Sequence, residues 1–246
     1  MDGHGECILQ SLRSRKSVRA FAPRPIDAAH KRLILASATE APTAGNQQLY
    51  TILDITDSRL KERLAVTCDN QPFIATAPMV LIFCADAQKW YDAYLEAGLS
   101  PRRPGAGDLL LAVDDALCAA QNAVVAAWAL GIGSCYIGDI MERCEEHRAL
   151  LHLPEYVFPA AMLVFGYPTA QQWAREKPAR CPLESIVHEN AYRRADGAAL
   201  RAMLGHKAAA KPWEEWVAAF CRRKYDSGFS REMSRSVAKY LEAYRE

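Results

Sequence analysis

A strong net charge is absent from this chain of 246 residues, in which 30 Lys and Arg stand against 29 Asp and Glu and leave a net charge of +1. This balance excludes a uniformly cationic surface of the kind that binds nucleic acid without sequence preference. A charged fraction of 24% and a hydrophobic fraction of 50% are ordinary for a globular protein and exclude a disordered one. The length predicts one large domain, or one domain with an appendage.

Paired cysteine motifs and targeting segments are also absent. The eight Cys form no CxxC or CxC spacing, so a zinc site is not indicated. No apolar stretch follows a basic segment near residue 1, so we expect a cytoplasmic protein with reduced thiols. The longest apolar stretch, residues 109–130, is interrupted by two aspartates, a glutamine and an asparagine. These polar residues favour a buried helix of a soluble protein over a membrane span.

The common nucleotide-binding and metal-binding motifs are missing as well. No GxxxxGK[ST] sequence is present, which argues against a phosphate-loop NTPase. A short glycine pair fails the dinucleotide fingerprint, because Tyr136 stands at the third glycine position and a helix precedes the pair. His147 and His152 are five residues apart, unlike a zinc-binding pair, and we predict that both are surface or capping residues. Cys135 is interpreted as a structural thiol.

Helices and strands are mixed along the chain without a regular βαβ alternation, which predicts an α+β fold. Asp27 is expected to cap a helix over residues 28–38 whose inner face holds Leu33, Ile34 and Ala38. Residues 108–130 predict a long apolar helix at the centre of the fold or at a subunit interface. Further helices are expected at residues 7–12, 60–66, 142–151, 214–220 and 232–244, and strands at 49–55, 79–85, 133–137 and 159–165.

Two segments carry candidate binding groups. Residues 11–32 hold seven basic residues against a single acid, Asp27. Arginine forks suit phosphate oxygens, so this segment is a candidate phosphate clamp, although a solvated charge run has the same composition. Residues 42–48 form a loop in which Gly45 is followed by three amide side chains. Amides both donate and accept hydrogen bonds, as the edge of a flavin or nicotinamide requires, but a plain polar loop has this composition too.

Four segments match short motifs in the order and spacing of one known family. The matching segments are RKSVRAF at 15–21 with RRSxRxF, APTAGNQQ at 41–48 with APSxxNxQ, GIGSCYIG at 131–138 with GxGxxxxG, and GYP at 166–168 followed by KPAR at 177–180. On these motifs the chain resembles the FMN-dependent nitroreductase family from about residue 7 to residue 190. Each motif alone is weak evidence for the family, but all four occur in the family's order and spacing, which makes the resemblance strong.

The resemblance implies a nitroreductase-like α+β sandwich, with a central mixed or antiparallel sheet flanked by helices. It also implies an intertwined homodimer with one FMN in each of two interface sites. The basic opening and closing motifs would hold the FMN phosphate, and the loop would come from the other subunit. The cofactor-binding residues implied are Arg15, Lys16, Ser17 and Arg19, then Pro42, Thr43, Ala44, Asn46 and Gln48, then Ile137 and Gly138 near flavin N5, and finally Lys177 and Arg180.

The function implied is hydride transfer from NADH or NADPH through flavin N5 to a nitroaromatic, a quinone or a similar small acceptor. FMN would carry the chemistry, so no catalytic side chain, metal, nucleic acid or membrane partner is expected. Two alternatives stay open. One is other flavin chemistry on the same scaffold, such as dehalogenation or flavin fragmentation. The other is a flavin-binding regulatory module without turnover.

The chain departs from the family pattern in three places. Thr43 replaces the usual Ser and keeps its hydroxyl, and Leu49 and Tyr50 stand where many members have Pro and Trp. Residues 191–246 extend past the common core. We therefore expect an FMN-binding core over residues 1–190 and a helical extension over residues 191–246.

Overall fold

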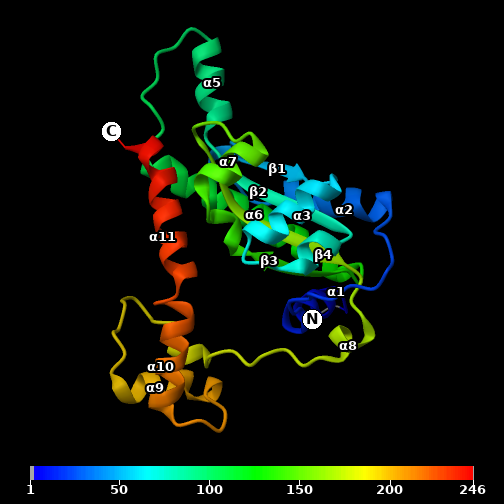
Figure 1. Ribbon diagram of the computed structural model, residues 1–246, viewed down its shortest axis with the longest axis vertical. Helices are drawn as coiled ribbons and strands as arrows, with labels where there is room; N and C mark the ends of the chain where they lie inside the picture. The colour runs from blue at the N-terminus through cyan, green and yellow to red at the C-terminus, as the bar shows by residue number, and fades with distance from the viewer. Residues whose placement is uncertain (1–2, 246) are drawn as a thin grey trace. The chain divides into compact units, whose positions relative to one another are not determined.

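The sheet consists of four antiparallel strands within residues 3–245, the part of the chain that this computed structural model describes (Figure 1). Their order is β1 (Tyr50–Asp54), β2 (Met79–Asp86), β4 (Val157–Gly166) and β3 (Gly133–Ile137). All residues of the central strands β2 and β4 are buried, as their continuous apolar sequences predict. The expected strands are thus confirmed to within one or two residues at each end.

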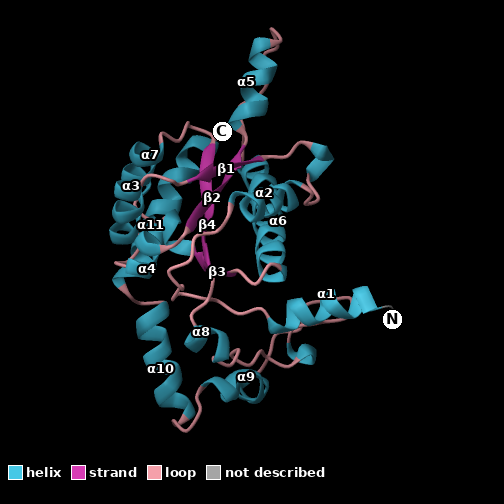
Figure 2. Ribbon diagram, turned by 90° about the vertical axis from the view of Figure 1, so that its right-hand side faces the viewer, coloured by secondary structure: helices cyan, strands magenta, loops and turns pink. Residues whose placement is uncertain are grey.

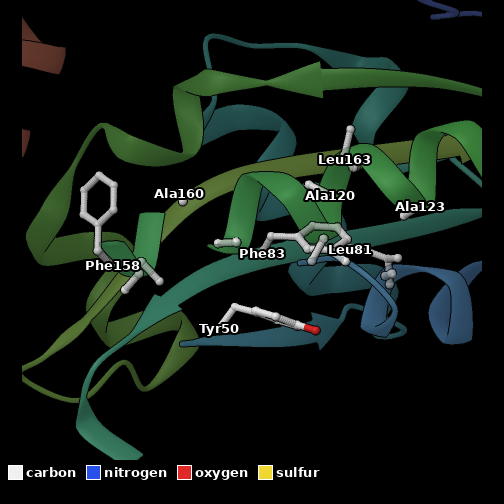
Figure 3. Packing of buried hydrophobic residues seen from close by; sticks show 14 of the residues in the cluster. Tyr50, Leu81, Phe83, Ala120, Ala123, Phe158, Ala160 and Leu163 are labelled. Atoms are coloured by element: carbon white, nitrogen blue, oxygen red, sulfur yellow. The ribbon is translucent and has the colours of Figure 1, made fainter. Parts of the chain in front are cut away.

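Helices cover both faces of the sheet (Figure 2). One face packs on α2 (Ala28–Thr39), α6 (Ala106–Ala129) and the C-terminal part of α11 (Gly228–Leu241). The other face packs on α3 (Ser58–Thr67) and α4 (Pro72–Thr76). Alternate residues of β2 enter the two cores, and Figure 3 shows Leu81 and Phe83 turned toward Ala120 and Ala123 of α6. This three-layer arrangement confirms the predicted α+β sandwich.

Helix α6 is the central helix of the fold. Its inner face is a stripe of buried alanines, which lets the helix approach the sheet closely. At the start of the helix Asp108 accepts the Gly105 N–H at 2.7 Å. The helix ends at Ala129, and Gly131 follows with a φ of 72°, the left-handed geometry that favours glycine. By length and composition α6 is apolar enough to cross a membrane, but its buried stripe belongs to the core.

The segment after α1 (Gly3–Ser14) runs beside β3 and is fixed there by two glycines. Ser17 forms a parallel bridge with Ser134, and the Val18 N–H donates to the Ser134 carbonyl at 2.9 Å. A Cβ on Gly133 would lie 2.5 Å from the Val18 side chain, and one on Gly166 would lie 2.6 Å from Phe21. Glycine at both positions therefore allows the basic opening motif to lie against the end of the sheet.

Helix α2 confirms one expectation and corrects another. Asp27 caps the helix by accepting the His30 N–H at 2.8 Å, and Ile34 and Ala38 are fully buried. Leu33 was expected on the inner face, but 54% of it is exposed. The reason is geometric, since neighbouring residues on a helix point about 100° apart and Ile34 already faces the core.

The remaining helices are mostly short. They are α5 (Gln88–Glu96), α7 (Cys144–Leu151), α8 (Ala170–Ala174), α9 (Gly197–Leu204) and α10 (Trp213–Lys224), with one-turn helices at Ala44–Asn46 (η1), Gly138–Met141 (η2), Leu183–Ser185 (η3), Gly205–Lys207 (η4) and Glu242–Tyr244 (η5). Helices α7 and α10 lie at expected positions, whereas α5, α8 and α9 have no counterpart among the predicted helix ranges.

The chain divides into two compact units. The first runs to Arg175 and resumes at Glu232, and the second is Glu176–Arg231, with α9, α10 and the first residues of α11. The C-terminal residues belong to the core of the first unit, where the Tyr240 ring packs edge-on against Phe158 with centroids 5.0 Å apart. The expected division into domains at residue 190 stays a prediction, since these units divide the chain at other residues.

Candidate functional site

A cradle of basic and hydroxyl side chains, formed by Arg15, Ser17 and Arg19, lies beside the buried Cys135 of β3. Burial raises the pKa of the Cys135 thiol, while the charges of Arg19 and Arg15 and hydrogen bonds from Arg19 and Ser17 oppose that rise. Among the described residues, no carboxylate forms an ion pair with Arg15 or Arg19. The cradle is therefore a place where two guanidinium groups are available to an anion.

Lys16 points elsewhere than its neighbours in the motif. Its ammonium donates to the Trp173 carbonyl at 2.6 Å and also bonds to the carbonyl of Arg175, so it ties the opening motif to the end of α8. Arg175 donates in turn to the Ser17 carbonyl at 2.6 Å. Sequence reasoning missed Arg175, which stands just ahead of the closing motif. It adds a further positive charge beside Ser17.

The remaining cofactor residues expected near the cradle lie in two places. Ile137 is buried at the end of β3, and the exposed Gly138 begins η2 directly after it. Lys177 and Arg180 belong to the unit Glu176–Arg231. Their approach to the cradle therefore stays a prediction.

The second group of predicted residues forms the amide loop, residues 42–48. Three of its residues have left-handed backbone geometry, with φ of 57° at Gly45, 56° at Asn46 and 50° at Gln48. Thr43 stabilises the loop internally, because its hydroxyl accepts the Gln48 N–H at 2.7 Å. Left-handed geometry at a non-glycine residue costs free energy and persists only where the surroundings impose it.

Those surroundings are hydrogen bonds from outside the loop. Asp115 of α6, only 4% exposed, accepts the Ala44 N–H at 2.9 Å with one carboxylate oxygen and the Leu49 N–H at 3.0 Å with the other. Trp90 of α5 donates to the Gln47 carbonyl at 2.8 Å. The loop backbone is thus held at both ends and in the middle. The side chains of Asn46 and Gln48 stay exposed.

From the sequence, the two adjacent aspartates of α6 were interpreted only as polar interruptions of an apolar stretch. The structure gives Asp115 a different role, as the acceptor for loop N–H groups. The signal that could have revealed it is a carboxylate on the buried alanine face of α6, since a buried charge needs hydrogen-bond donors.

The residue before the cradle and the amide loop contact α6 at points that lie far apart along the helix. Ser14, next to the cradle, accepts from the Trp128 indole at 3.0 Å, whereas the loop is bound to Asp115. Thirteen helical residues correspond to about 20 Å along the axis. Figure 2 shows α1 near one end of α6 and the start of β1 toward the other. The two groups of predicted flavin-binding residues are therefore separate within one chain.

A cavity of about 320 Å³ adjoins the amide loop. The rings of Trp90, Tyr91 and Tyr94 from α5 line it together with Gln47 and Leu49 of the loop and its flank. Its volume is at the lower end of the range for sites that take small organic molecules.

His147 corrects the expectation of a surface or capping residue. It is fully buried, with one ring nitrogen 2.9 Å from the Ile140 carbonyl and the other 2.8 Å from the Thr67 hydroxyl. Burial lowers the pKa of His147, so the ring is a neutral crosslink between η2 and α3.

Glu142 is a buried carboxylate that follows η2. It is 5% exposed, and one of its oxygens accepts no hydrogen bond from the described residues. Burial raises the pKa of Glu142 to about 7, and the charges of Asp139, Asp69 and Glu232 add to the rise while Arg143 opposes it. Below about pH 7 the protonated form is therefore favoured in the folded protein.

Comparison with known proteins places this geometry in a family. The sequence model of the Nitroreductase family matches residues 12–167, which include the cradle, the amide loop and β3. The chain therefore belongs to the Nitroreductase family.

Individual relatives extend the likeness. The chain is 34% identical over 76% of its length to the oxygen-insensitive NADPH nitroreductase of Salmonella typhimurium, of which it covers 75%. It is 28% identical over 96% of its length to the NAD(P)H FMN reductase of Bacillus subtilis, of which it covers 91%. The structure of NfrA2 from B. megaterium matches with a TM-score of 0.80 and 28% identity, covering 95% of this chain and 96% of that one.

Replacing Asp115 with alanine should destabilise the protein. Asp115→Ala leaves two buried loop N–H groups without an acceptor, and we expect the free energy of unfolding to fall by about 2–4 kcal/mol. Urea denaturation measures this change. The matched control is Asp114→Ala, because Asp114 is the exposed neighbour on the same helix and should change stability by less than about 0.5 kcal/mol. Equal losses in the two variants would contradict the role of Asp115.

Glu142 predicts a pH dependence of stability. Because its pKa is raised from 4.5 to about 7 on folding, its contribution to stability falls as the pH rises from about 4.5 and levels off above about 7. Glu142→Gln should therefore be more stable than the wild type above pH 7, by about 1–3 kcal/mol, with the difference vanishing toward pH 4.5. Unfolding curves across this range test it, and a difference independent of pH would disprove it.

Proposed function

We propose that the protein is a homodimeric FMN-dependent oxidoreductase that passes electrons from NADH or NADPH to a nitroaromatic, a quinone or a similar small acceptor. The sequence predicted an FMN-dependent oxidoreductase that uses NAD(P)H. The family and its named relatives confirm this general activity. The acceptor, the dimer and the cytoplasmic location belong to the proposal. The observation that carries it is the pair of complementary half-sites on one chain.

The cradle fits the phosphate of FMN. Arg15 and Arg19 offer planar forks without a carboxylate partner among the described residues, and Ser17 adds a hydroxyl. Bound FMN would supply the electron chemistry, accepting a hydride at N5. The protein's contribution is to bind the phosphate in the cradle and to place backbone groups near Ile137 and Gly138 against the ring.

The amide loop fits the ring of a flavin bound to another copy of the chain. Asp115 and Trp90 fix the loop backbone, while Asn46 and Gln48 expose side chains that both donate and accept hydrogen bonds. Because Ser14, next to the cradle of the same chain, contacts α6 about 20 Å away along the helix axis, the loop would complete a site with the cradle of a second subunit.

The outer face of α6 supports a dimer. Leu110 is 64% exposed, and Leu111 and Leu117 also stand out from the helix on the side away from the sheet. Exposed apolar side chains grouped on one helix mark an interaction surface. A second copy packed on this face would bury them and place the amide loop of one chain near the partner.

A small planar acceptor suits the cavity beside the amide loop. Its aromatic walls, Trp90, Tyr91 and Tyr94, favour a flat apolar molecule, and its 320 Å³ exclude a large one. This supports a nitroaromatic or quinone acceptor rather than a macromolecular one.

Replacing Arg15 with alanine should weaken FMN binding. Loss of charge-assisted hydrogen bonds to phosphate is expected to cost about 1.5–3 kcal/mol in binding free energy, measured by fluorescence titration with FMN. Arg32→Ala is the control. Arg32 is an exposed arginine on α2, so its substitution removes the same charge at another place. Unchanged FMN affinity in Arg15→Ala would show that Arg15 does not bind the FMN phosphate. Failure of the wild type to bind FMN would refute the proposed function.

A further inference from the structure

The turn after β3, residues 137–142, connects the expected flavin-facing backbone to helix α7. Ile137 and Gly138 stand at its start, and η2 carries the chain on to Met141. Helix α7 then begins without a capping side chain of its own, because its N-cap residue Arg143 has left-handed geometry and makes no side-chain cap bond. The missing cap is supplied from the C-terminal end of the sequence.

Ser236 of α11 supplies it. The Ser236 side chain is fully buried, and its hydroxyl donates to the Met141 carbonyl at 2.7 Å while accepting the Cys144 N–H at 2.8 Å. One hydroxyl therefore joins the last residue of η2 to the first residue of α7. A buried group that bonds in both directions fixes the relative position of the two elements more firmly than packing alone.

A second residue of α11 strengthens the same contact. Glu232 lies one helical turn before Ser236, on the same side of the helix, and accepts the Arg143 N–H at 3.1 Å. Arg235 also joins α11 to α7, because it pairs with Glu145 of α7 at 2.9 Å and with Glu232 at 2.8 Å. Helix α11 thus binds the backbone of Met141, Arg143 and Cys144.

We propose that Ser236 is a positioning residue for the flavin, acting through the turn at residues 137–142. By fixing Met141, Ser236 sets the orientation of the one-turn helix that begins at Gly138, and with it the backbone that faces flavin N5. The C-terminal helix is thereby part of the machinery that tunes the cofactor. This inference rests on the proposed function, because it requires FMN to lie against Gly138.

The test compares Ser236→Ala with the wild type in the full-length protein. Tyr244→Phe is the matched control, since it also removes one buried hydroxyl from the C-terminal segment, where Tyr244 packs on Tyr156 and its hydroxyl bonds to no described residue. The measurements are the affinity for oxidised FMN, the midpoint potential of bound FMN and thermal unfolding of the FMN-free protein.

We expect Ser236→Ala to bind oxidised FMN about three- to tenfold more weakly, the range that corresponds to loss of one positioned hydrogen bond. Oxidised N5 accepts a hydrogen bond, whereas reduced N5 carries a hydrogen, so the reduced form should lose less. The potential should then rise, by about 30 mV if the affinity ratio changes tenfold. Tyr244→Phe should leave affinity and potential unchanged.

Two results would overturn the proposal. One is a folded Ser236→Ala protein with wild-type affinity and potential. The other is an equal shift in Tyr244→Phe, which would indicate a general structural effect. If Ser236→Ala does not fold, Glu232→Ala decides, since the partly exposed Glu232 contributes one bond to the same turn and should give a smaller shift in the same direction. Loss of FMN binding in the wild type would instead refute the proposed function.

Discussion

The arrangement of the candidate site depends on one buried carboxylate. Asp115 lies on the alanine-rich inner face of α6, where an unpaired charge would be costly, and it is satisfied by the N–H groups of Ala44 and Leu49. The bonds stabilise the aspartate and the loop together. A loop with three left-handed residues keeps its shape because the carboxylate holds both of its ends, and Asn46 and Gln48 can then be exposed without losing their orientation.

The same helix separates the two halves of the site. Its opposite end contacts the segment that carries Arg15, Ser17 and Arg19, and Gly133 and Gly166 let that segment lie against the sheet. The helix of 24 residues therefore keeps the contacts of the loop and of the segment before the cradle about 20 Å apart along its axis. The outer face of α6 exposes Leu110, Leu111 and Leu117, and this is the surface proposed to pack on a second chain. Ser236 connects the C-terminal helix to the turn at residues 137–142 that follows β3.

Much of the fold could be predicted from the sequence, because local signals and tertiary packing agree there. The continuous apolar runs of β2 and β4, the Asp27 cap and the Gly131 terminus of α6 are of this kind. Leu33 and His147 were placed wrongly, since hydrophobicity alone does not show which side of α2 faces the core, and spacing alone does not show that Thr67 and Ile140 provide partners for a buried ring. The roles of Asp115, Arg175 and Ser236 depend on residues 66 to 158 positions away in the chain, which no local pattern reveals.

The central claim is that each flavin site takes its cradle from one chain and its amide loop from another. Mixed dimers of an Arg15→Ala chain and an Asn46→Ala chain, purified through two different tags, test it most directly. NADH-dependent or NADPH-dependent reduction of a quinone would be measured at an FMN concentration that fills only wild-type sites. If the sites are shared, one site of the mixed dimer combines both defects and the other has neither, so turnover should be about half that of the wild type. Turnover no higher than that of the two single-variant homodimers would contradict the account.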